Sequence, residues 1–221
     1  MGARMAMPTD AQILTLAQWL SPAFPIGAFA YSHGLEAAVE MGWVRDSGSF
    51  ETWLCDVLDC GAGRSDALFL AASYHAPDTV TLAEINAAAG AFAASAERLL
   101  EAQAQGAAFC KLTNTVWGTQ LDELLYPVAL GVAARHERLP LALTARMYLQ
   151  AIASNLIAAA QRLLPLGQTE AQAILHRLSE LCGEIAETCV LGDLGCLGAT
   201  AFLADIAAMK HETQYSRIFR T

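Results

Sequence analysis

Apolar side chains along this chain recur at the spacing of helices. From Ile13 to Leu20 they repeat at intervals of three and four residues, which places them on one face of a helix, and Pro22 ends the pattern. No segment keeps the strict alternation of apolar and polar residues that is typical of a strand. The pattern therefore predicts an all-α fold.

Glycine and proline mark the ends of most predicted helices. The predicted helices cover residues 10–20, 35–41, 49–60 and 65–75, a segment beginning near 81, 96–117, segments beginning near 127 and 140, a segment from about 169 to 190, and 199–211. Two N-caps follow from the capping-box pattern, Thr81 with Glu84 and Thr169 with Gln172. About ten helices with short connections predict a single all-α domain over residues 1–221, with orthogonal or bundle-like packing.

The composition adds an expectation about the surface. Hydrophobic residues make up 55% of the chain and charged residues only 16%. Part of the excess is alanine, which favours helices and lets them pack closely. We assign the remainder to apolar surface that contacts other proteins, and we expect a symmetric homodimer with a helix-on-helix interface.

Charge and targeting patterns limit the partners and the compartment. With a net charge of −9 and no cluster of Lys and Arg, the chain is not expected to bind nucleic acid. The charge-free stretch from Ile13 to Leu35 is long enough to cross a membrane, but Pro22, Pro25 and Gly27 interrupt it. The N-terminus lacks the apolar core and cleavage site of a secretory signal. We therefore expect no membrane association, a cytoplasmic location and reduced cysteines.

Motifs for catalysis or cofactor binding are missing from the sequence. It has no Gly-rich phosphate loop with Lys and Ser/Thr, no H-E-x-x-H, no C-x-x-C and no G-x-S-x-G. Cys182, Cys189 and Cys196 recur every seven residues, but buried cysteines more often act as small hydrophobic residues than as metal ligands. A histidine near the end of a helix, such as His211, more often interacts with the helix dipole than ligates a metal. We expect a protein that is not an enzyme and has no resident cofactor or metal.

The loop that follows the first helix is unusually apolar. Between Ser21 and Glu36 it is uncharged and contains Phe24, Phe29 and Tyr31 beside two prolines. Two interpretations stay open at this point. Either the loop folds back into the core, or it presents a rigid aromatic surface to another protein.

The last residues form a second unusual segment. If residues 212–221 are helical, Tyr215, Ile218 and Phe219 form an apolar stripe that nothing later in the chain covers, and Arg217 and Arg220 lie on the other side. Tyr and Arg are common in the energetic centres of interfaces. We predict a flexible docking tail, with an ordinary frayed terminus as the alternative.

Together these segments resemble a known family. The string from Leu20 to Glu36, the stretch from Asn155 to Gln168 and the ending from His211 to Arg220 are similar to UreF, the urease accessory protein of the nickel-insertion machinery. The resemblance spans nearly the whole chain, and neither the loop nor the ending is a generic pattern. Ile218 stands where a Leu is often seen, which changes shape without loss of apolar area.

The resemblance implies a fold and partners. It implies an all-α protein, usually dimeric, that binds the accessory protein UreD and recruits the GTPase UreG to apo-urease for GTP-dependent nickel insertion. It also implies that residues of the loop and of the ending lie at partner contacts, namely Tyr31, Ser32, His33, Gly34, Glu36, Tyr215, Arg217, Phe219 and Arg220.

Two other functions remain as alternatives to a scaffold. A regulator of GTP hydrolysis by UreG would use Arg217 or Arg220 to neutralise phosphoryl charge, as an arginine finger does. A nickel carrier would use the cysteines and histidines directly, but scattered ligands seldom make a tight site.

Overall fold

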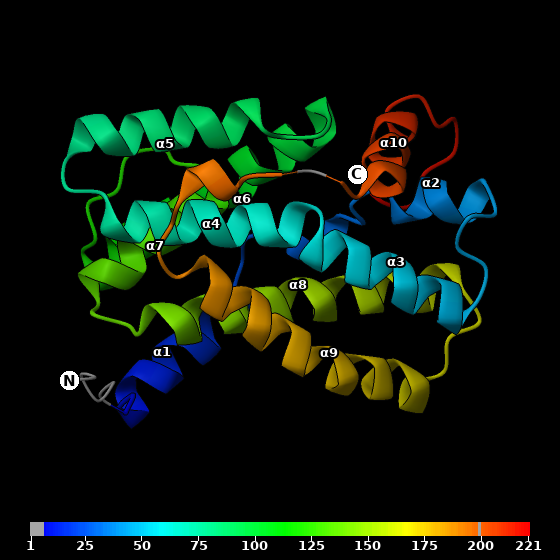
Figure 1. Cartoon of the computed structure of the whole chain (residues 1–221), viewed down its shortest axis with the longest axis horizontal. Coiled ribbons are helices and arrows are strands. Elements are labelled where there is room, and N and C mark those ends of the chain that lie inside the picture. The colour runs from blue at the N-terminus through cyan, green and yellow to red at the C-terminus, as the bar shows by residue number, and fades with distance from the viewer. Residues whose placement is uncertain (1–6, 199) are drawn as a thin grey trace.

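In the computed structural model, the chain folds into helices and their connections over the described residues, 7–198 and 200–221 (Figure 1). In chain order, the α-helices are α1 (Asp10–Trp19), α2 (Leu35–Glu40), α3 (Ser47–Asp59), α4 (Ala62–His75), α5 (Thr79–Ala91), α6 (Ala96–Trp117), α7 (Tyr126–His136), α8 (Leu141–Leu163), α9 (Gln168–Cys189) and α10 (Phe202–His211). Short 3-10 turns, η1 (Ala28–Ala30) and η2 (Leu194–Cys196), lie in the connections. The all-α prediction is confirmed, and each predicted helix has an observed counterpart; residue 199, at the predicted start of the last one, lies outside the described residues.

α4 is the central helix. Its residues from Ala67 to Ser73 are all buried, and α3, α5, α7, α8 and α9 pack around it. α7 crosses α4 very closely, because a Cβ added to Gly131 would lie 2.1 Å from Ser73 Oγ and 2.2 Å from the carbonyl oxygen of Leu70. Glycine is therefore required at this crossing.

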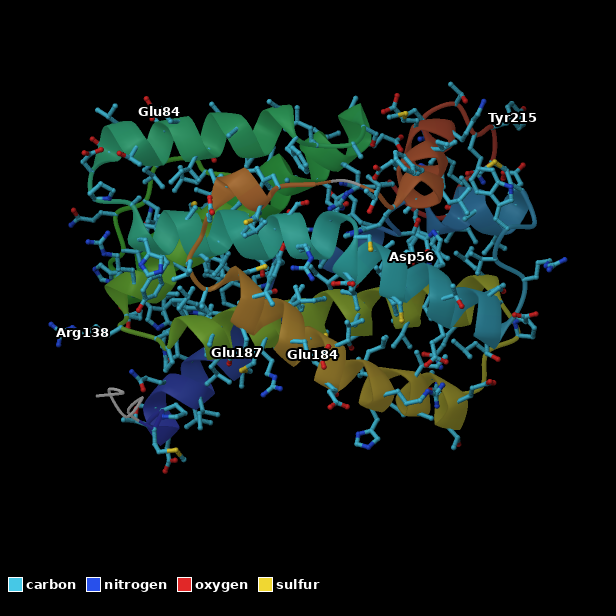
Figure 2. All side chains as sticks on the ribbon, in the orientation of Figure 1. Asp56, Glu84, Arg138, Glu184, Glu187 and Tyr215 are labelled. Carbon is cyan, nitrogen blue, oxygen red and sulfur yellow. The ribbon has the colours of Figure 1, made fainter. Side chains whose placement is uncertain are left out.

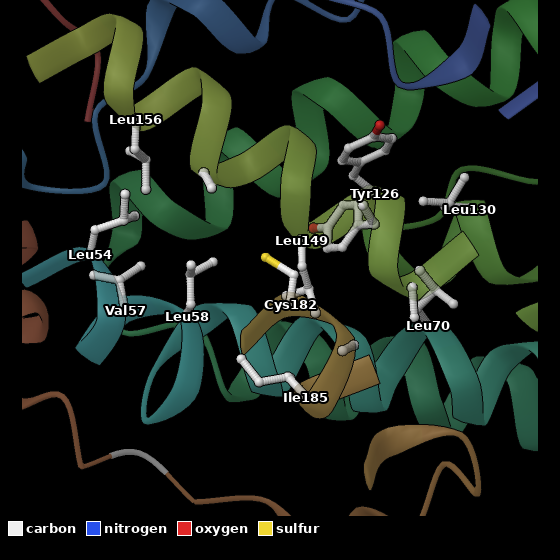
Figure 3. Close-up of a cluster of buried hydrophobic side chains, with 14 of the residues drawn as sticks. Leu54, Val57, Leu58, Leu70, Tyr126, Leu130, Leu149, Leu156, Cys182 and Ile185 are labelled. Atoms are coloured by element: carbon white, nitrogen blue, oxygen red, sulfur yellow. The ribbon is translucent and has the colours of Figure 1, made fainter. Parts of the chain in front are cut away.

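Part of the core lies between α4 and the antiparallel pair α8 and α9. Figure 3 shows apolar side chains from α3, α4, α7, α8 and α9 interdigitating there, with Cys182 of α9 among them. Burial raises the pKa of the Cys182 thiol to about 11, so it stays protonated and packs as an apolar group.

The regularly spaced cysteines do not come together as a site. Cys189 is buried on α9 like Cys182, whereas Cys196 is exposed in η2, beyond the end of that helix. Across the described ranges, all six cysteines are free thiols and no group of His, Cys, Asp and Glu is arranged to hold a metal ion. No helix among these residues is both long and apolar enough to cross a bilayer.

Both predicted N-caps are wrong. α5 begins at Thr79, two residues earlier than predicted, because the Asp78 carboxylate accepts a hydrogen bond from the backbone N–H of Thr81 at 2.8 Å. α9 begins at Gln168 after Gly167, which has no side chain to cap it. In both helices the Thr that was predicted as the N-cap lies inside the first turn. A Thr followed three residues later by Glu or Gln can therefore occur there without forming a capping box.

Candidate functional site

The three segments that carry the family resemblance meet at one place in the fold. Asn155 of α8 donates from its side-chain amide to the carbonyl oxygens of Ala28 and Tyr31, at 2.9 and 3.3 Å. On the same helix, the Arg162 guanidinium lies 4.6 Å from the centre of the Phe219 ring, a cation–π contact. α8 therefore supports both the loop and the ending of the chain.

The loop and the ending also pair through their backbones. The N–H of Arg220 donates to the carbonyl oxygen of Ala30, and the N–H of Ser32 donates to the carbonyl oxygen of Thr221, both at 2.8 Å. The Ser32 hydroxyl donates to the same Thr221 oxygen. Residues 189 positions apart in sequence thus lie side by side.

Glu36, in the first turn of α2, holds the ending in place. Its carboxylate accepts hydrogen bonds from the N–H groups of Ile218 and Phe219, at 2.7 and 2.9 Å. The same carboxylate lies 3.4 Å from Nε2 of His211, which is completely buried at the end of α10.

His211 extends this network to α6. Its Nδ1 lies 2.7 Å from the Glu97 carboxylate, which also pairs with the Arg217 guanidinium at 2.5 Å. Acidic and basic groups therefore alternate from Glu36 through His211 and Glu97 to Arg217. This alternation joins α2, α10, α6 and the ending by charge-assisted hydrogen bonds, which are stronger than neutral ones.

A tight turn brings the loop against α10. Gly34 has a φ of 81°, and a Cβ added to it would lie 2.5 Å from the backbone nitrogen of Ala208. His33, just before it, also has a positive φ, of 56°. Such a backbone conformation is rare in residues other than glycine and is tolerated only where the surroundings enforce it.

A buried charged cluster lies beneath this turn. His33 Nε2 is 3.1 Å from the Glu101 carboxylate, which also pairs with Arg98 of the same helix. Burial alone would raise the pKa of Glu101, but Arg98 and His33 outweigh it and lower the pKa to about 2. Glu101 is therefore charged at neutral pH, and its partners in the chain compensate that charge.

The pKa of a second carboxyl group in the cluster is shifted in the opposite direction. Burial raises the pKa of Asp66, and Arg98 and a 2.8 Å hydrogen bond from the Tyr148 hydroxyl counter this only in part. Two cavities, of about 210 and 160 Å³, share His33, Asp66 and Arg98 in their walls. The groups described here engage one another, so the arrangement is suited to holding segments together.

The loop residues that were predicted from the resemblance lie inside the molecule. Tyr31, Ser32, His33, Gly34 and Glu36 are all buried in the isolated chain. Of the two interpretations of the loop, folding back into the core is correct for these residues and for Phe24. Phe29, in contrast, is 71% exposed. Ser32 and Glu36 bond directly to the ending of the chain.

The ending differs from its predicted helical form. α10 ends at His211, and the following residues form turns, so Tyr215, Ile218 and Phe219 do not share a helical stripe. The prediction that nothing covers the stripe is wrong for Phe219, which is 4% exposed against the loop and Arg162. Tyr215 is fully exposed (Figure 2). Ile218, Arg217 and Arg220 are exposed as well.

α10 carries a surface that sequence reasoning missed. It buries the small side chains Ala204, Ala207 and Ala208 and exposes large apolar ones. The exposed residues are Phe202 (66%), Leu203 (56%), Ile206 (42%) and Met209 (52%). We call these four the α10 face. The order of alanines and large residues along α10 carried this information, because the helix approaches α2 at Gly34 too closely for larger side chains to face inward.

The buried partners of the predicted residues were also missed. Glu97, Arg98 and Glu101 lie within two turns of α6, a spacing common on solvated helices, so only the fold reveals that they meet His33 and His211.

Comparison with known proteins identifies close relatives. The model of the UreF family matches residues 44–179. A urease accessory protein UreF from Ruegeria pomeroyi is 55% identical over 217 residues, which cover 98% of this chain and 100% of the relative. The UreF of Roseobacter denitrificans is 51% identical, covering 99% of this chain and 97% of the relative. The UreF of Rhodopseudomonas palustris is 43% identical, with 96% and 94% covered.

Proposed function

Since the chain belongs to the UreF family of urease accessory proteins, we propose that it is a non-enzymatic cytoplasmic scaffold in urease maturation. With the accessory protein UreD, it recruits the GTPase UreG to apo-urease for GTP-dependent nickel insertion, and nickel is the cargo of the assembly. The relatives are named only as urease accessory proteins, so the partners and the nickel step are part of the proposal.

The observation that carries the proposal is the α10 face. A helix that buries alanines and exposes four large apolar side chains presents a docking surface, because contiguous exposed apolar patches on a folded protein mark interaction sites. Tyr215 and Ile218 are also exposed, in the segment that follows α10. Arg217 and Arg220 supply a polar, charged rim, as interfaces commonly have.

In this proposal the loop residues act indirectly. Buried Tyr31, Ser32 and His33 hold the ending in the position from which its exposed side chains reach the partner. The docking role of residues 212–221 therefore rests on Tyr215, Arg217 and Arg220 at the surface, while Phe219 anchors the segment.

A paired substitution tests the scaffold. Leu203→Ser with Ile206→Ser removes apolar area from the α10 face, and Ile13→Ser with Leu14→Ser removes a comparably exposed pair from α1. We expect both proteins to stay folded, since exposed changes usually alter stability by at most about 0.5 kcal/mol each. Only the α10 variant is expected to lose capture by UreD and urease activation in cells. The proposal is contradicted if only the α1 variant loses both functions, or if neither variant loses them.

Regulation of GTP hydrolysis is the second candidate, and one observation favours Arg220 for it. The Arg217 guanidinium is already paired with Glu97, whereas among the described residues the exposed Arg220 side chain makes no ion pair. A regulator would insert this free cation beside the transferred phosphoryl group. Arg220→Lys should then slow GTP hydrolysis by UreG in an intact complex, whereas a scaffold role predicts unchanged hydrolysis per assembled complex.

A further inference from the structure

A groove runs between α3 and the beginning of α10. Its volume is about 410 Å³. Three aromatic rings line it: Trp43 from the α2–α3 connection, Trp53 from α3 and Phe202 from α10. Trp43 and Phe202 are 37% and 66% exposed, whereas Trp53 is buried and stacked on Phe50. The groove is therefore open and has one fixed aromatic wall.

One negative charge lies among these rings. Asp56 of α3 is exposed and lines the groove (Figure 2). The two neighbouring acids of α3 are already paired, Glu51 with Arg177 and Asp59 with Arg64, and no basic side chain lines the groove within the described residues. Aromatic faces and an unpaired carboxylate both attract cations, so the groove is complementary to a positive charge carried by an apolar body.

We propose that this groove receives an arginine side chain from a partner protein. The planar guanidinium stacks on an aromatic face and forms paired hydrogen bonds with a carboxylate, which an ammonium group cannot do with the same geometry. The aliphatic part of the side chain packs against Leu203 and the rings, as long charged side chains commonly do on apolar surface.

The position of the groove favours a protein partner over a small cation. Phe202 and Leu203 belong both to the groove and to the α10 face, so a protein that covers α10 also covers the groove. The unpaired carboxylate of Asp56 beside these apolar residues favours a partner that brings a basic side chain to this edge. The inference rests on the proposed docking role of α10, but the chemistry of the groove can be tested without an accessory protein.

The test uses a peptide and the tryptophan side chains as reporters. The folded chain, with ¹⁵N-labelled indoles assigned by single Trp→Phe variants, is titrated with acetyl-Leu-Ala-Arg-Leu-Ala-amide and with its citrulline counterpart, which has the same shape without the charge. We expect the arginine peptide to shift the Trp43 resonance saturably at millimolar concentration. Trp19, which is completely buried beside Phe109, should stay unchanged. The citrulline peptide is expected to bind about tenfold more weakly, the typical effect of losing one charge-assisted hydrogen-bonded pair.

Two matched variants separate the groove from general charge attraction. Asp56→Asn and Glu187→Gln each remove one exposed negative charge, from the groove and from α9 respectively (Figure 2). Only Asp56→Asn should weaken the arginine peptide, also by about tenfold. The inference is overturned by an absent Trp43 response, by equal binding of both peptides, or by equal weakening in both variants. Full displacement of the peptide by equimolar spermidine would instead identify a site for small polycations. If these results go against the groove while the α10 variants behave as proposed, the scaffold proposal stands alone.

Discussion

At Glu101, burial and charge act on one carboxyl group in opposite directions. Arg98 and His33 outweigh burial, so the folded-state pKa, about 2, lies below the ordinary value of 4.5. A group with a lowered pKa stabilises the fold above its ordinary pKa, and this contribution is lost as the pH falls toward the folded value. The contribution of Glu101 should therefore disappear between about pH 4.5 and pH 2. Asp66 has a raised pKa, so its contribution to the stability of the fold has the opposite pH dependence and is lost as the pH rises.

Glu101→Gln tests this balance. The variant leaves Arg98 buried beside a neutral group, so at neutral pH we expect a loss of about 3 kcal/mol or more in the free energy of unfolding. As the pH falls from about 6 to about 3, the variant should lose less stability than the wild type, because the titrating group is gone. Urea unfolding across this range measures both effects. Glu84→Gln, on exposed α5 surface, should follow the wild type; a variant curve parallel to the wild type would contradict the assignment.

Gly34 tests the close contact of the loop with α10. In Gly34→Ala the new methyl group would lie 2.5 Å from the backbone of Ala208, so α2 and α10 must move apart. Gly42→Ala is the matched control, because Gly42 has a similar φ of 70° but nothing within 4 Å of the added Cβ. We expect a loss of about 1 kcal/mol for the control, from backbone strain alone, and about 3 kcal/mol or more for Gly34→Ala. Equal losses in chemical denaturation would mean that the contact does not constrain the fold.

Burial was the property of single residues that the sequence could not supply. Tyr31 and Phe29 have the same apolar character and lie two residues apart, yet one is 4% and the other 71% exposed. The difference depends on the ending of the chain, whose backbone pairs with Ala30 and Ser32 although these residues are distant in sequence. A local pattern contains no information about that pairing, so the loop could be singled out but not placed.

Helices were predictable because each one depends on residues within a few positions. Apolar periodicity together with proline, glycine and capping patterns located them, and α6 (Ala96–Trp117) was predicted with its observed ends. The errors lie at helix starts, where several polar residues compete for the free N–H groups. The prediction of a helix for the ending was wrong for another reason. Its apolar residues suggested a helix, but its backbone bonds to the loop and to Glu36 instead of forming helical hydrogen bonds.

The start of α5 gives a direct test at this scale. Asp78 accepts from the N–H of Thr81, so Asp78→Ala should destabilise the protein by about 1 kcal/mol, the usual cost of losing an N-cap. Thr81→Ala should change the free energy of unfolding by no more than about 0.5 kcal/mol, because Thr81 lies inside the first turn. Thermal and urea unfolding of the two variants compare them directly. A larger effect at Thr81 would restore the sequence-based assignment of the cap.

Across the whole molecule, the large exposed apolar side chains fall in separate regions. The α10 face lies at one end, and other exposed residues include Ile13 and Leu14 on α1 and Leu100 and Val116 on α6. The composition indicated that such surface exists, but its location depends on which helix faces are used for internal packing. α10 keeps its alanines for the core and leaves its large residues outside, which is opposite to the usual arrangement of an amphipathic helix.

The oligomeric state tests how this surface is divided. We expect the chain to form a homodimer at micromolar concentration, because more large apolar side chains are exposed than the α10 face alone contains, and we expect the dimer to use surface outside α10. The variant Leu203→Ser with Ile206→Ser should therefore sediment as a dimer like the wild type while failing to bind the accessory partner. Sedimentation velocity over a range of concentrations measures the first property, and capture by UreD measures the second. A soluble wild-type monomer at every concentration would show that the dimer prediction is wrong. A wild-type dimer that becomes monomeric only in the α10 variant would assign the α10 face to the subunit interface, and the scaffold proposal would then lose the observation on which it rests.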